Sequence, residues 1–84
     1  MYGKQKQKGE IIAAFEGLKA ATYEYINALE RKAGPDFVID NAAEIISIVG
    51  DTVEKHGGNV LEVIYAEDMA RKRIKQIKEG NNDR

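Results

Sequence analysis

The sequence predicts an all-α protein, a three-helix antiparallel bundle that associates into a helical dimer. Apolar residues recur at steps of three and four along most of the chain, as they do on one face of a helix. Two breaks, Gly34-Pro35 and Gly57-Gly58, divide the chain into three segments, because glycine often follows one helix and proline often begins the next. A chain of 84 residues makes one domain with a small core, so association would add apolar burial.

The first helix is predicted over about residues 9–33. Its apolar residues alternate steps of four and three, which is the pattern of a bundle seam. Residues 1–8 contain three lysines, no acid and no helix-capping signal, so they are expected to form a flexible basic tail before the single helical domain of residues 9–79. The stripe consists of Ile11, Ala14, Phe15, Leu18, Thr22, Tyr25, Leu29 and Ala33.

The second helix is predicted over about residues 36–56. Asp36 lies in its first turn, where a carboxylate suits the positive end of the helix dipole. The β-branched run from Ile45 to Val49 could also be a strand, but no other segment alternates with period two to pair with it. The apolar stripe consists of Val38, Ala42, Ile45, Ile46, Val49 and Val53.

The third helix is predicted over about residues 59–79. Asn59 is a suitable N-cap, and residues 80–84 are expected to be a disordered C-terminal tail. The main apolar stripe consists of Val60, Val63, Ala70, Ile74 and Ile77.

Each segment carries apolar residues that its main stripe does not use. Three interpretations remain open: scattered exposed side chains, a third helix that is central and buried on both faces, or a protein–protein interface. The interface is the hypothesis carried forward, because all three segments have a surplus and the chain is small. The candidate interface residues are Leu61, Tyr65, Met69, Phe37 and Ile48, with Ile12, Tyr23 and Ile26 as a second patch.

Charge is distributed unevenly along the chain, although the net charge is only −1. Residues 9–68 contain twelve acids and four basic residues, whereas residues 69–84 contain six basic residues and two acids. The basic ends could contact nucleic acid, or the acidic body of a second copy. The candidate contact residues for nucleic acid or an acidic partner are Lys4, Lys6, Lys8, Arg71, Arg73, Lys75 and Lys78.

Helix physics explains part of the basic stretch at Arg71–Lys78 without any ligand. Glu67 and Asp68 each stand four residues before a basic residue, which is the favourable order for helical ion pairs. Arg73 and Lys78 have no such local partner. Nucleic-acid binding therefore remains the alternative to a protein–protein function.

The chemistry of enzymes and metal sites has little support in the sequence. The chain has no cysteine, which excludes disulfides and thiolate metal sites. The single histidine, His56, precedes Gly57-Gly58 and suits the end of a helix, and no nucleophile–base set is recognisable. No catalytic residue, cofactor or metal is expected, and no apolar run is long enough for a bilayer, so a cytoplasmic location is expected.

The sequence thus predicts a small non-catalytic interaction or regulatory protein that acts through helix-face contacts. A homo-oligomer, most simply a dimer, or a heterologous protein partner would use these faces. The chain has the general look of small helical proteins from phages and other mobile elements, although no motif carries that likeness.

Overall fold

Four helices make up the part of the chain that the structure, a computed structural model, describes. The description covers the backbone of residues 2–82 and the side chains of residues 14–80. The all-α class is confirmed, whereas the predicted three helices are four, because the second segment is divided. The helices are α1 (Tyr2–Ala33), α2 (Pro35–Asp40), α3 (Ala42–Lys55) and α4 (Val60–Asn82).

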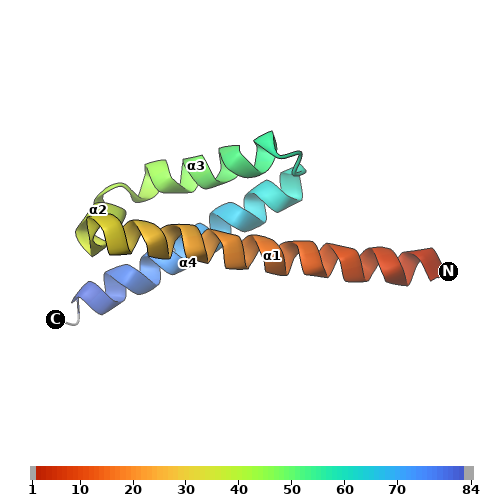
Figure 1. Ribbon diagram of the computed structural model, residues 1–84, viewed down its shortest axis with the longest axis horizontal. Coiled ribbons are helices and arrows are strands. Elements are labelled where there is room, and N and C mark those ends of the chain that lie inside the picture. Colours follow the sequence, from red (N-terminus) through yellow and green to blue (C-terminus); the bar gives the residue numbers. More distant parts are fainter. Residues whose placement is uncertain (1, 83–84) are drawn as a thin grey trace.

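Helix α1 is the longest element and begins earlier than the sequence pattern predicted. Its 32 residues correspond to about 48 Å, and its start extends well beyond the turn that joins α3 to α4 (Figure 1). The radius of gyration is therefore 14.6 Å, compared with about 12 Å for a compact domain of this length. Helix α1 ends at Ala33 and is followed by Gly34, whose φ of 91° is readily adopted only by glycine.

The break between α2 and α3 lies at Asn41. Its side-chain Nδ2 donates a hydrogen bond to the carbonyl of Phe37 at 2.8 Å, and its backbone N–H bonds to the same carbonyl at 3.1 Å. Asparagine favours such local bonds over a continuous helix, which explains why the predicted single helix divides here. The short α2 turns the chain so that α3 runs back over α4.

The α3–α4 turn depends on two adjacent glycines. Gly57 has a φ of 87°, and the N–H of Gly58 bonds to the carbonyl of Val53 at 2.9 Å, in the manner of a helix C-cap. Helix α4 then starts with a reciprocal cap, as predicted for Asn59. The N–H of Asn59 donates to Glu62 Oε1, and the N–H of Glu62 donates to Asn59 Oδ1, both at 2.9 Å.

Helix α4 is the central helix of the fold. Both α1 and α3 pack against it, but they make almost no contact with each other. Ala66 and Ala70 are fully buried, and their small side chains let both neighbours approach the α4 backbone. Of the three interpretations left open by the sequence, a central third helix therefore describes this part of α4. The core consists of Ile26, Val38, Ile45, Val49, Ala66, Ala70, Ile74 and Ile77.

Candidate functional site

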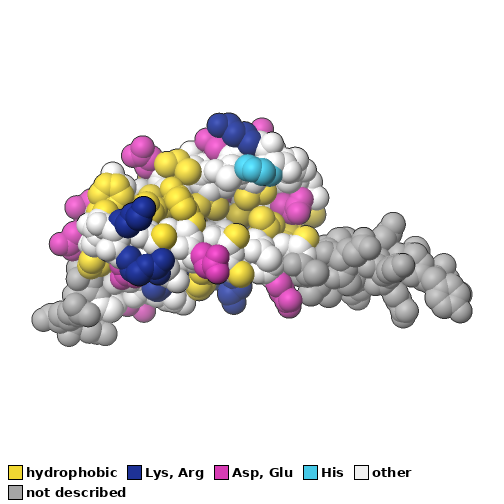
Figure 2. Space-filling view, viewed as in Figure 1, with side chains coloured by type: hydrophobic (Ala, Val, Ile, Leu, Met, Phe, Trp, Pro, Cys, Tyr) yellow, Lys and Arg dark blue, Asp and Glu magenta, His cyan; other side chains and the backbone are white. Residues whose placement is uncertain are grey.

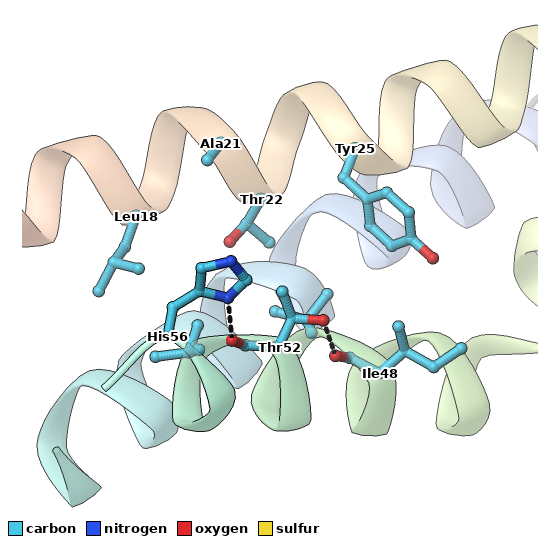
Figure 3. Close-up of a pocket in the computed structure, with 9 residues that line it drawn as sticks. Leu18, Ala21, Thr22, Tyr25, Ile48, Thr52 and His56 are labelled. Atoms are coloured by element: carbon cyan, nitrogen blue, oxygen red, sulfur yellow. Dashed lines mark hydrogen bonds between the residues drawn. The ribbon is translucent and has the colours of Figure 1, made fainter. Parts of the chain in front are cut away.

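An open apolar groove lies between α1 and α3. It exists because these helices contact α4 rather than one another, so α4 passes behind the space that they leave (Figure 3). Its volume is about 420 Å³, within the usual range of binding sites. Figure 2 shows apolar side chains gathered in the band between the two helices. The groove is lined by Leu18, Ala21, Thr22 and Tyr25 from α1, and by Ile48, Val49, Thr52, Val53 and His56 from the α3 side.

The two walls of the groove carry exposed side chains that a closed bundle would bury. Tyr25 on α1 and Ile48 on α3 are 38% and 41% exposed, and they lie on opposite walls (Figure 3). Between them Thr22 and Val49 are buried. The groove therefore has a buried floor and two partly exposed apolar walls, which is the usual cross-section of a helix-binding groove.

The polar side chains of the α3 wall are occupied by local hydrogen bonds. Thr52 Oγ1 donates to the carbonyl of Ile48 at 2.7 Å. His56 Nδ1 lies 2.9 Å from the carbonyl of Thr52, so Nδ1 carries the proton and donates (Figure 3). This contact agrees with the helix-end role that the sequence indicated for His56. The groove thus presents mainly apolar surface.

A second exposed apolar surface lies at the start of α4, which we call the ridge. It consists of Val60, Leu61 and Ile64, whose exposed fractions are 72%, 68% and 55%. Their spacing of one, three and four residues puts them on neighbouring positions of one helix face. The sequence had placed Val60 in the core stripe. The structure leaves it at the first turn of α4, where neither neighbouring helix covers it.

The predicted interface residues of the third segment are separated by the fold. Leu61 is exposed, but Met69 is only 6% exposed, so Met69 belongs to the interior of the chain and not to a free face. Tyr65 is half-buried, and its ring lies 4.8 Å from that of Phe15. Helix α1 covers this side of α4, which the sequence could not show.

The remaining predicted interface residues have equally different environments. Phe37 is 44% exposed, like Ile48 in the groove. Ile26 is fully buried, which corrects its assignment to a surface patch. Tyr23 is half-buried, with Lys19 Nζ 5.7 Å from its ring centroid. The side chain of Ile12 lies outside the described residues.

The face of α1 that meets α4 is rotated from the predicted stripe. The stripe centred on Leu18 included Tyr25 and excluded Ile26, whereas the structure buries Ile26 and leaves Tyr25 exposed. The two neighbours differ by about 100° on the helix, so a modest rotation exchanges them. The hydroxyl of Tyr25 was the sequence feature that could have indicated its exposure, because a phenolic hydroxyl commonly reaches water.

Arg73, which the sequence left without a partner, connects α4 to α1. Its Nε donates to Asn27 Oδ1 at 2.7 Å, and its Nη2 lies 3.4 Å from Glu30 Oε1. This half-buried side chain is therefore engaged within the chain. Lys72 pairs with Asp68 at 3.5 Å, as the helical spacing predicted.

The other predicted basic contacts lie apart from the groove walls. Arg71, Lys75 and Lys78 are exposed on α4. The side chains of Lys4, Lys6 and Lys8 lie outside the described residues. The first turn of α1 and the last turn of α4 lie at opposite ends of the long axis (Figure 1), so one copy does not join its two basic ends. Nucleic-acid binding stays a prediction.

The part of the chain that the structure describes was compared with the requirements of a metal site and of a membrane-spanning helix. Within it, no three acidic or histidine side chains are grouped so that they could hold a metal ion. None of the described helices has the length and apolar character needed to cross a bilayer.

Comparison of the chain with protein-family models, with curated proteins and with solved structures gives no match.

Proposed function

We propose that this is a small non-catalytic interaction protein that self-associates through helix faces, with the groove between α1 and α3 as its docking surface. The observation that carries the proposal is the groove itself, which stays open because α1 and α3 both pack on α4 and make almost no contact with each other. An apolar groove of this size is unfavourable in water. A docked helix would remove its walls from solvent.

The arrangement of the helices suits a helical occupant. Helices α1, α3 and α4, with an open space between α1 and α3, form an incomplete four-helix bundle. An amphipathic helix is about 10 Å wide and carries its apolar side chains on one face. That face would contact the apolar walls around Tyr25 and Ile48. The hydroxyl of Thr52 and Nδ1 of His56 are engaged by helix carbonyls, which supports a docking role over a catalytic one.

Self-association is tested by the mass of the protein in solution as its concentration is raised. We expect the wild type to exceed the 9.4 kDa of one chain at high micromolar concentration. Ile48→Asp should weaken association by at least about tenfold, because a carboxylate would be buried against apolar walls. Light scattering coupled to size-exclusion chromatography measures both proteins.

The matched control is Ser47→Asp, which places the same charge on the neighbouring exposed residue of α3 that does not line the groove. Its mass should follow that of the wild type. Equal association of the Ile48→Asp and wild-type proteins would show that the groove is not the docking surface. A wild type that stays monomeric throughout the concentration range would contradict self-association.

A further inference from the structure

His56 is the groove residue whose charge can change near neutral pH. Histidine is the side chain that ordinarily gains or loses a proton between pH 5 and pH 8, and the chain contains one histidine. His56 follows the last residue of α3 and lines that end of the groove. The charge of the groove wall can therefore change within this pH range through a single residue.

A hydrogen bond holds the imidazole ring in one orientation. Nδ1 of His56 donates to the carbonyl of Thr52 at 2.9 Å. It can do so in the neutral and in the protonated ring, because protonation then adds the second proton at Nε2. Figure 3 shows the ring pointing from this bond toward the α1 wall. Protonation thus puts a positive charge on the groove side of a ring that keeps its place.

The α3 wall offers no carboxylate that could balance this charge inside the groove. Among the described residues that line the groove, none is acidic. Asp51, Glu54 and Lys55 are exposed on the same helix, but none of them lines the groove. These side chains can exchange their water for little else, so they act on the ring only across solvent.

The other two helices of the groove add no acidic group either. The charged residues of α1 next to its lining positions are exposed and do not line the groove, and they are Glu16, Lys19 and Glu24. On α4, Glu62 Oε1 accepts a hydrogen bond from the N–H of Asn59 at 2.9 Å, and the Glu67 side chain lies against Gly50. The phenol of Tyr25 lines the groove toward its other end (Figure 3). An imidazolium in a covered groove would therefore have no counter-ion from its own chain.

We propose that His56 makes docking in the groove depend on pH, so that the groove accepts a helix when the ring is neutral and releases it when the ring is protonated. This inference rests on the proposed docking function and adds its regulation. In the free chain His56 is exposed, so water and the carbonyl end of α3 stabilise the positive charge. A docked helix covers the groove side of the ring, where a charge without a partner is unfavourable.

The sign of the effect follows from the number of protons that each state binds. The free chain can carry the extra proton on His56 and the docked chain excludes it, so association weakens as the pH falls. The loss of one proton for each covered groove changes the affinity by at most about tenfold per pH unit. We therefore expect association to weaken about tenfold between pH 8 and pH 5.5.

The test is the self-association constant of the full-length protein at pH 8 and at pH 5.5, measured by sedimentation equilibrium at one ionic strength. The wild type should associate about tenfold more weakly at pH 5.5. His56→Gln keeps a polar side chain that has no charge at either pH, so its association should be the same at both. The matched control adds Lys55→His to His56→Gln, which moves the histidine to an exposed neighbour outside the groove, and it should stay independent of pH.

The outcomes separate this inference from the proposed function. A wild type that associates equally at both pH values overturns the inference and leaves the docking function standing. Stronger association at pH 5.5 overturns it too, because an acidic group of the occupant would then meet the ring. So does a pH dependence that His56→Gln retains or that the matched control restores. A wild type that is monomeric at both pH values and at every concentration overturns both proposals.

Folding is followed by circular dichroism at both pH values. The wild type and His56→Gln should have equal helicity at pH 8 and pH 5.5, because the substituted position is exposed and lies at the end of a helix. A loss of helicity at pH 5.5 that the wild type shows and His56→Gln lacks would assign the pH dependence to folding, and it would overturn the regulation of docking.

Discussion

Replacing Ile26 with alanine is expected to lower the free energy of unfolding by about 2–5 kcal/mol. Ile26 is fully buried and belongs to the cluster in which α1 meets α4. Truncation removes apolar contacts and leaves a cavity that the neighbouring helices fill only in part. Each kcal/mol should lower Tm by about 4–8 °C in a domain of this size, and thermal denaturation followed by circular dichroism measures the change.

The control is Ile64→Ala, which makes the same chemical change at a position that is 55% exposed. It should change stability by less than about 1 kcal/mol when measured at concentrations at which the wild type is monomeric. If Ile26→Ala is as stable as the wild type but weakens self-association, Ile26 belongs to an interface, as the sequence pattern first indicated, and the packing of α1 described above is wrong.

Enlarging the small residue at the centre of α4 should have the next largest effect. Ala70→Leu adds three carbons at a fully buried position between α1 and α3. The outer helices would have to move apart or the leucine would have to adopt a strained rotamer, which typically costs about 1–3 kcal/mol. Chemical denaturation at constant protein concentration measures the loss.

Ala43→Leu is the matched control, because Ala43 is exposed on α3 and tolerates a larger side chain without displacing a helix. An Ala70→Leu protein that is more stable than the wild type would mean that unfilled space lies beside α4. That result would contradict the close approach of both outer helices to its backbone.

The fold follows from the sequence wherever one local rule determines it. Gly34 and Gly57 end helices because they adopt positive φ, and Asn59 caps α4 through its reciprocal bonds with Glu62. The division at Asn41 was missed because the apolar stripe continues through it, from Val38 to Ile45. Periodicity reports which residues share a face, but not whether the backbone between them stays helical.

The candidate site was predictable only in part. Ile48 could be recognised from the sequence as a surplus apolar residue, because it lies off the main apolar stripe of its segment. The groove was not, since a single helical wheel does not show which helix lies between the other two. Once α4 takes the central position, Met69 becomes core and α1 turns Tyr25 outward. The burial of Met69 and the exposure of Tyr25 depend on tertiary packing, which a local sequence pattern does not describe.

The open groove also predicts how the proposed association would respond to temperature. Docking would release the water that covers the apolar walls in the free chain, and burial of such surface has a negative heat-capacity change. The driving force would therefore weaken on cooling, so assemblies held together mainly by this contact would dissociate in the cold. Dilution calorimetry at several temperatures would report that change directly, and it would distinguish an apolar contact from one held by the charged chain ends.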